Sequence, residues 1–180
     1  GLYIIDLESE EIEKAIDWNN QKIDWDGRGG ERGLRGIAFF EDKVYLASSN
    51  EIYVYDKSLK LLDIIKNKYL KFNHEICIDD KKLYITSTGY DSIVVFDLVK
   101  YDFVKSYCIR TVNGVQPENS FLGRRIKRFR NKLNIKQKIK LNFFEFNPKQ
   151  EDGPVEGDTT HINNVFIKDE LLPGFKFMKE

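Results

Sequence analysis

The sequence predicts an all-β protein made of repeated four-stranded antiparallel units. Two stretches of the 180-residue chain, Gly36–Asp63 and Glu75–Lys105, align with each other at an offset of about 40 residues. A four-stranded unit with this period is typical of the blades of a β-propeller, which occur in series because each blade buries both faces against its neighbours. The matched pairs are Tyr45 with Tyr84, Ser48 with Ser87, Ile52 with Ile93, and Asp56 with Asp97.

Each repeat divides into short runs of β-branched and aromatic residues. Asp, Asn, Lys and Ser separate these runs, as they do in tight hairpins. The two repeats therefore predict complete blades over residues 35–66 and 74–109. We expect strands near residues 36–40, 43–48, 51–56 and 60–66, and then near 75–79, 82–87, 92–97 and 102–109.

The two ends of the chain resemble half-blades. Leu2–Leu7 matches a third strand and Glu11–Trp18 a fourth, whereas His161–Asp169 matches a first strand and Phe175–Met178 a short second one. The half-blades, 1–18 and 161–179, could pair with each other, be completed by a second copy, or be cut edges of a longer ring. We therefore expect one domain over 1–180 with about three blades, forming a partial or oligomer-completed ring.

A basic segment interrupts the last repeat, inside a loop and helix insertion over 111–157. Apolar residues from Leu122 to Leu133 follow the spacing i, i+4, i+7, i+11 after a possible N-cap at Ser120, which predicts an amphipathic helix. The helix could be a lid whose basic arc only faces water, or it could bind an anionic surface. The candidate anion-binding residues are Arg124, Arg125, Lys127, Arg128, Arg130 and Lys132.

Composition excludes several classes of protein. Lys plus Arg and Asp plus Glu both number 29, so the chain is neither a wholly basic nucleic-acid coat nor an acidic disordered chain. Two cysteines are too few for a disulfide scaffold. No apolar run approaches the ~18 residues of a spanning helix, so we expect a soluble protein, with the cytoplasm favoured.

The long connections of the predicted blades all leave one face. They run over residues 19–34, 67–73 and 111–160, from each fourth strand to the next first strand. Elaborated loops on a rigid scaffold are common binding sites. The candidate residues of this binding rim are Arg35, Asn73, Asp158, Thr160 and Asn163.

Both histidines of the chain open an inner strand. His74 and His161 occupy equivalent places in different blades, where they could hold a divalent metal in the central channel. Glu75 would then be the candidate catalytic acid or base, and Asp158 could orient His161. Alternatively, the two histidines only form hydrogen bonds across the channel and make it rigid.

Three segments carry a resemblance to a known family: Asn73–Ile78 (NHEICI), Leu83–Leu98 (LYITSTGYDSIVVFDL) and Asp158–Val165 (DTTHINNV). Together they resemble prokaryotic NHL/YVTN-like β-propeller proteins, in particular an uncharacterised bacterial group. The resemblance implies a propeller of about six blades. Peptide-amidating lyases are more remotely similar in fold and place channel histidines around a metal, a role that only His74 and His161 could fill here.

Two functions follow from these expectations. The first is a binding module that presents its rim of loops to a peptide, glycan or protein partner. The alternative is a metal-dependent propeller enzyme, a lyase or hydrolase, that uses the histidines at the mouth of the channel.

Overall fold

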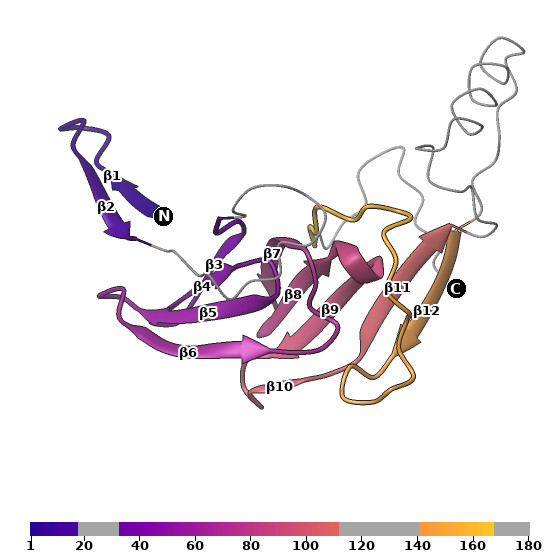
Figure 1. Cartoon of the computed structure of the whole chain (residues 1–180). Helices are drawn as coiled ribbons and strands as arrows, with labels where there is room; N and C mark the ends of the chain where they lie inside the picture. The colour runs from indigo at the N-terminus through magenta and orange to yellow at the C-terminus, as the bar shows by residue number, and fades with distance from the viewer. Residues whose placement is uncertain (18–32, 112–140, 168–180) are drawn as a thin grey trace, which may run out of the picture.

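The structure is a computed structural model that describes residues 1–17, 33–111 and 141–167. In these three ranges the regular elements are β-strands and one short 3-10 turn at Thr88–Tyr90, which confirms the all-β class. The strands form three antiparallel sheets (Figure 1). They are β1 (Leu2–Ile5), β2 (Ile12–Ile16), β3 (Ile37–Phe40), β4 (Lys43–Ala47), β5 (Glu51–Asp56), β6 (Leu61–Lys66), β7 (Asn73–Asp79), β8 (Lys82–Ser87), β9 (Ser92–Asp97), β10 (Asp102–Phe103), β11 (Ser106–Thr111) and β12 (Leu141–Phe146).

The first sheet confirms the four strands predicted for residues 35–66. Its order is β3-β4-β5-β6, so each strand pairs with the next one along the chain. In the turn after β5, the Asp56 side chain accepts the N–H groups of Ser58 and Lys60, both at 2.9 Å. Such a turn is built by a short acidic side chain that satisfies backbone donors.

The same turn recurs wherever the repeat places an aspartate. Asp97 ends β9 and accepts the N–H groups of Val99 and Lys100 at 3.0 and 2.9 Å. Asp6 follows β1 and accepts the N–H groups of Glu8 and Ser9, both at 2.9 Å. The repeat in the sequence is therefore a repeat of local hydrogen bonding.

The second sheet contains the predicted strands of residues 74–109 and one strand more. Its order is β12-β11-β9-β8-β7, with the short β10 also paired to β9, so the predicted fourth strand is split in two. The additional strand β12 pairs with β11 from Ser106↔Phe146 to Thr111↔Leu141. The prediction of an insertion of loop and helix alone over 111–157 is therefore wrong for residues 141–146.

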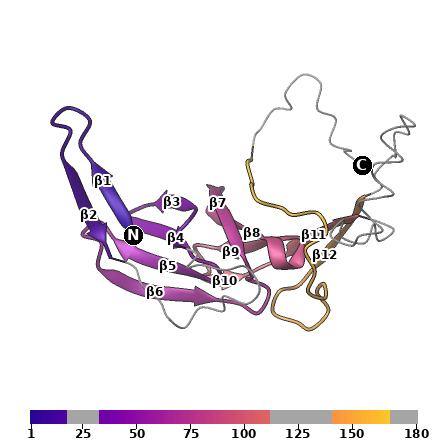
Figure 2. The same cartoon turned by 45° about the horizontal axis from the view of Figure 1, so that its top comes forward.

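The open end of the β1–β2 hairpin contacts the outer face of the first sheet. Leu2 and Ile16 pack there against the cluster of Val44, Leu46, Tyr53 and Tyr55. The turn of the hairpin points away from the first sheet (Figure 2), and most of its side chains are exposed. The predicted half-blade at the N-terminus is thus a two-stranded sheet that touches the next unit only at one end.

The main core lies between the first and second sheets. Buried side chains of β4 and β5 pack there against buried side chains of β8 and β9. The two sheets also meet through their backbones just before β3 and at the start of β7, where the Gly36 N–H donates to the His74 carbonyl at 2.9 Å. A Cβ at Gly36 would lie 2.6 Å from the Ile76 nitrogen. The largest core side chains include Tyr45, Ile52, Val54, Leu83, Ile85, Val94 and Phe96.

Other predictions about the ends need correction or fall outside the described residues. The segment 161–167, expected to open an inner strand, has no strand hydrogen bonding, and β1 and β2 pair only with each other among the described strands. The described sheets do not close into a ring. The predicted helix from Ser120 to Leu133, with its six candidate anion-binding residues, and the strand at Phe175–Met178 lie outside the described residues.

No helix in the described ranges is both long enough and apolar enough to cross a membrane.

Candidate functional site

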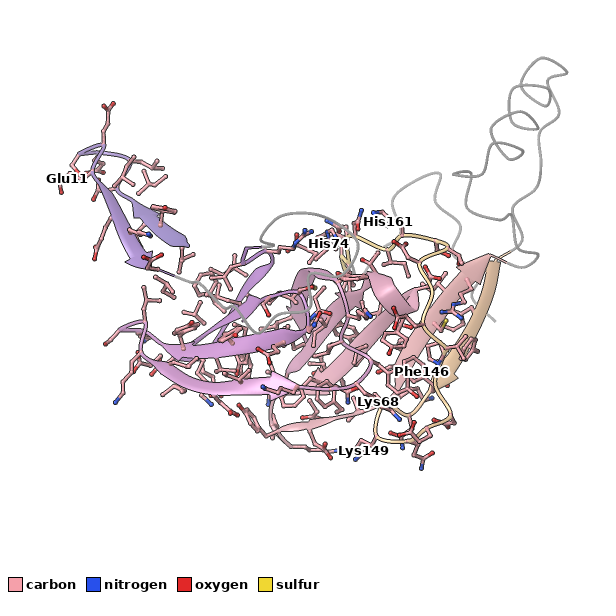
Figure 3. The ribbon with its side chains drawn as sticks, viewed as in Figure 1. Glu11, Lys68, His74, Phe146, Lys149 and His161 are labelled. Atoms are coloured by element: carbon pink, nitrogen blue, oxygen red, sulfur yellow. The ribbon has the colours of Figure 1, made fainter. Side chains whose placement is uncertain are left out.

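The predicted rim lies at one end of both large sheets. The β4–β5 turn, the β6–β7 connection and the β8–β9 turn reach this end because neighbouring strands are antiparallel. The segment after β12 begins near the opposite end and reaches the rim at residues 159–161, where it binds Asp91. His74 and His161 lie close together there, on the same edge of the molecule (Figure 3). We call the group Arg35, His74, Asp158 and His161 the rim cluster.

His74 lies at the start of β7, where a β-bulge interrupts the pairing with β8. The N–H groups of His74 and Glu75 both donate to the Thr86 hydroxyl oxygen, at 3.2 and 2.9 Å. The same hydroxyl donates to the Glu75 carbonyl at 3.0 Å. Because a bulge removes ladder partners, Thr86 supplies the bonds that keep His74 in place.

Arg35 approaches the His74 ring from the preceding segment. Its Nη1 lies 2.5 Å from Nδ1 and 3.0 Å from Nε2 of His74. A guanidinium can only donate, so the imidazole nitrogen that faces it must accept. The Arg35 backbone is itself held, since its N–H donates to the Ala47 carbonyl at 2.9 Å.

His161 lies opposite His74 on the segment that follows β12. The two ring centroids are 6.1 Å apart with the planes at 67°. His161 Nδ1 lies 2.9 Å from each carboxylate oxygen of Asp158, so the predicted contact between these two residues is present. A carboxylate only accepts, so Nδ1 carries the proton and Nε2 of the neutral ring is left to accept or to bind a ligand.

A fully buried aspartate holds the backbone that carries His161. The Asp91 carboxylate accepts N–H groups from Thr159 at 3.0 Å, Thr160 at 2.7 Å and His161 at 3.3 Å. It also accepts the Thr159 hydroxyl at 2.7 Å and pairs with Arg110 Nε at 3.3 Å. His161 has a left-handed backbone (φ 57°), which is strained for a side chain of this size. The bonds to Asp91 offset that strain.

Two further contacts tie the same segment to the β8–β9 turn. The Thr88 hydroxyl donates to the Ile162 carbonyl at 2.7 Å, and the Gly157 N–H donates to the Gly89 carbonyl at 2.8 Å. The segment therefore crosses the end of the second sheet in a defined path.

Tyr69 anchors an earlier part of this segment. Its hydroxyl donates to the Gln150 carbonyl at 3.1 Å and accepts the Gly153 N–H at 2.9 Å. A Cβ at Gly153 would lie 2.3 Å from the Tyr69 ring, so only glycine allows this approach.

The other predicted site residues do not all present their side chains at the rim. Asn163 is exposed, and Thr160 contributes its backbone N–H to Asp91. Asn73 is fully buried at 1% exposure, so it lies beneath the rim and not on it. Glu75 is half-buried, and its hydrogen bonds to Thr86 come from its main chain.

The described residues do not fit a metal centre. Nowhere in the described ranges do three or more His, Cys, Asp or Glu side chains gather in a way that could hold a metal ion. His74 and His161 supply two nitrogens, whereas a protein metal site commonly needs three or four protein ligands. The Asp158 carboxylate already receives the Nδ1 proton of His161.

Cys108 is a buried core residue. It is fully buried, and burial raises the pKa of its thiol, which keeps it protonated and inert.

The sequence analysis missed Asp91, although a signal for it exists. The alignment that pairs Ile52 with Ile93 also pairs Asn50 with Asp91, both just before the third strand of a repeat. The partners of Asp91 are 68 to 70 residues further along the chain, so its role depends on tertiary structure.

No protein-family model and no curated protein matches the sequence.

Proposed function

We propose that this chain is a binding module of the β-propeller type, which presents the rim cluster to a peptide, glycan or protein partner. The observation that carries the proposal is that polar side chains from separate segments converge at the rim. Arg35, His74 and His161 come from three separate segments and meet within hydrogen-bonding or ring-contact distance. Binding residues are disproportionately found on loops that a rigid scaffold holds in position.

The chemistry of the rim cluster suits a partner rich in oxygen acceptors. Arg35 supplies several N–H donors, and the two imidazole rings add nitrogen groups that can take part in hydrogen bonds. Carboxylate and hydroxyl groups of peptides and glycans are natural partners for such a set. Asp158 supports the site by orienting His161.

The scaffold supports the propeller part of the proposal. The sheets stack face to face, and the same aspartate turn follows β1, β5 and β9. A propeller of the NHL/YVTN-like kind is built in this way from sheets in series. Completion of the ring by a second copy, a cytoplasmic location and an anionic partner for the basic segment from Arg124 to Lys132 belong to the same proposal.

Arrays of immobilised peptides and glycans test this function. We expect wild-type protein to bind a subset of spots, and the double variant His74→Ala/His161→Ala to lose them. The control is Lys57→Ala/Lys100→Ala, which changes the turns at the opposite end of the sheets. If every bound spot survives in the histidine variant, or if the control loses the same spots, the rim cluster is not the binding site.

The alternative function, a metal-dependent lyase or hydrolase, is favoured by one observation. The Asp158 carboxylate on Nδ1 of His161 is the arrangement that orients many metal-binding histidines. Because the described residues supply only two histidine nitrogens, we derive no catalytic step for Glu75. Metal analysis of purified wild-type and His161→Ala protein decides the matter. Less than about 0.1 equivalent of metal in the wild type would exclude this alternative.

A further inference from the structure

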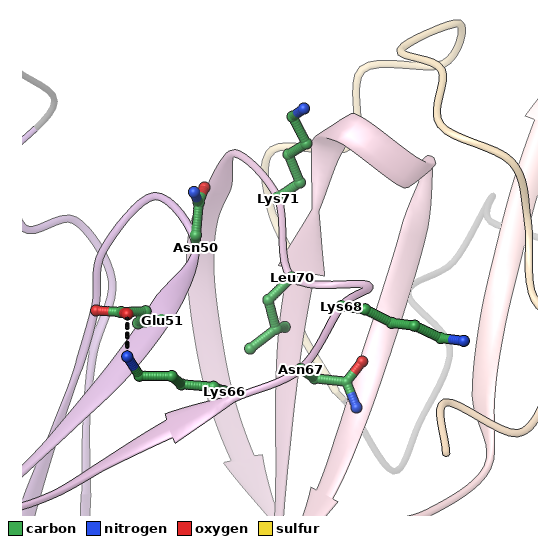
Figure 4. A pocket seen from close by; sticks show the side chains of 7 residues that line it. All are labelled: Asn50, Glu51, Lys66, Asn67, Lys68, Leu70 and Lys71. Atoms are coloured by element: carbon green, nitrogen blue, oxygen red, sulfur yellow. Dashed lines mark ion pairs between the residues drawn. The ribbon is translucent and has the colours of Figure 1, made fainter. Parts of the chain in front are cut away.

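A second candidate site lies along the β6–β7 connection, away from the rim cluster. Its residue Lys68 lies near Lys149, on the opposite edge of the molecule from His74 and His161 (Figure 3). The site is a shallow depression of about 550 Å³. It lies between the start of β5, the end of β6 and the connection from β6 to β7 (Figure 4). We call it the lysine pocket. It is lined by Asn50, Glu51, Lys66, Asn67, Lys68, Leu70 and Lys71.

The lysine pocket carries more positive than negative charge. Three of its lining residues are lysines and one is a glutamate. Glu51 is already neutralised, because Lys66 Nζ lies 2.8 Å from one carboxylate oxygen and the Tyr53 hydroxyl donates to the other at 2.9 Å. Lys68 and Lys71 are the lining cations whose carboxylate partners lie outside the lysine pocket.

Carboxylates already bind at two edges of the lysine pocket. Lys68 pairs with Glu151, and Lys71 Nζ lies 2.8 Å from Glu156. Both glutamates belong to the segment after β12, and their side chains are 93% and 53% exposed. Such solvent-exposed pairs are weak and exchange readily, so another carboxylate can replace either glutamate.

The wall of the lysine pocket contains hydrogen-bonding groups with unused capacity. Asn50 Oδ1 is buried without a hydrogen-bond partner in the described part of the chain. Two neighbouring residues are in the same state: the Ser49 hydroxyl, and both polar atoms of the Asn73 side chain. Asn73 is next to Ser49, since its N–H donates to the Ser49 carbonyl at 2.8 Å. Buried polar groups are nearly always satisfied. Ser49 and Asn73 lie beneath the wall, and Asn50 is the residue of the three that lines the lysine pocket, so its Oδ1 is the candidate acceptor for a ligand.

The second repeat shows what the Asn50 position can bind. Asn50 is equivalent to Asp91 in the alignment of the repeats. The Asp91 side chain accepts three consecutive backbone N–H groups, those of Thr159, Thr160 and His161. The side chain at this position of the blade is therefore placed to receive the backbone of a crossing segment.

We propose that the lysine pocket binds a short acidic peptide segment. The Asn50 side chain turns toward the lysine pocket, and its Oδ1 accepts a backbone N–H of the peptide, as Asp91 accepts those of the crossing segment. Carboxylates of the peptide pair with Lys68 and Lys71 and displace Glu151 and Glu156. The ligand is recognised by its carboxylates and its backbone, and the site is separate from the rim cluster of the proposed function.

The test uses the peptide Glu-Gly-Glu-Ser-Glu-amide with fluorescein on its N-terminal amine, and measures its binding by fluorescence anisotropy. The matched peptide carries Gln in place of each Glu. We expect the acidic peptide to bind and the Gln peptide to bind at least about tenfold more weakly, because each lost pair is a charge-assisted contact. Equal binding of the two peptides, or no binding of the acidic one, would overturn the proposal.

Variants that remove either a positive or a negative charge then locate the site. Lys68→Gln and Lys71→Gln should weaken binding about three- to tenfold, and Glu151→Gln and Glu156→Gln should strengthen it about two- to fivefold, because the competing carboxylates are gone. The opposite signs separate recognition from loss of folding, since an unfolded variant cannot bind more tightly.

The remote pair of Lys105 and Glu145, whose charged atoms are 2.6 Å apart, supplies matched controls. Lys105→Gln and Glu145→Gln make the same changes of charge and should leave the affinity within about twofold of wild type. If the control variants shift the affinity as much as those at the lysine pocket, net charge alone explains binding and the proposal fails. It also fails if His74→Ala/His161→Ala abolishes binding, since the peptide would then bind at the rim cluster.

Discussion

Asp91 shows how one buried carboxylate organises an exposed site. Its acceptor atoms hold three consecutive backbone N–H groups, and the last of these belongs to His161. The turn aspartates Asp6, Asp56 and Asp97 act only on neighbours within four residues. Their role was therefore predictable from the repeat, whereas that of Asp91 was not, because its partners are distant in sequence.

Replacement of Asp91 should separate the segment at 158–161 from the second sheet. Asp91→Ala leaves several N–H groups without their acceptor and removes the ion pair with Arg110, and we expect the free energy of unfolding to fall by about 2–4 kcal/mol. Urea unfolding measures this loss. Asp97→Ala, which removes an exposed turn carboxylate, is the control and should cost less. Equal losses for the two variants would show that Asp91 has no special role.

At the scale of elements, the hairpins were predictable and the edge of the second sheet was not. The paired repeats and their turn residues predicted β3 to β9 nearly residue by residue. Strand β12 was missed because it follows the basic segment and lies outside the repeat. The segment at 161–167 reads as a strand in the alignment, yet its start is bound by Asp91 and Thr88 and it forms no ladder.

A hydrogen bond between β6 and the turn after β9 should make the free energy of unfolding depend on pH. The Tyr101 hydroxyl donates to Asp63 at 2.7 Å, and this bond lowers the pKa of Asp63. Burial, and then the same bond, raise the pKa of Tyr101. The stability that Asp63 contributes is fully present above its pKa in the unfolded chain, about 3.9. It is lost as the pH falls through the lower pKa of Asp63 in the folded protein. The Tyr101 contribution is present below pH ~10 and is lost as the pH rises through its folded value.

Tyr101→Phe should therefore make the free energy of unfolding change less with pH, both in the acidic range and in the alkaline range. We expect a loss of only about 0.5–1 kcal/mol near pH 7, because both side chains are substantially exposed. Urea unfolding of wild type and variant from pH 2.5 to 5 and from pH 9 to 11 measures the effect. Parallel profiles over both ranges would mean that this hydrogen bond is not formed in solution.

For the molecule as a whole, the shared core makes one cooperative unit of the two large sheets. Ile85 is fully buried in the cluster that also contains Ile52 and Val54 of the first sheet. Ile85→Ala should cost about 2–5 kcal/mol through lost burial and the cavity it leaves. Hydrogen exchange should show the same loss of protection in β4 and β5 as in β8 and β9. Loss confined to β8 and β9 would show that the sheets unfold separately.

The central claim is that face-to-face packing of repeated sheets brings His74 and His161 together at one end. The most direct test is a nuclear Overhauser measurement between the two rings, which is unambiguous because the chain has two histidines. With ring centroids 6.1 Å apart, we expect a cross-peak between their ring protons. We also expect it to weaken or vanish in Asp91→Ala. A folded wild-type protein whose rings show cross-peaks to other residues but none to each other would contradict the claim.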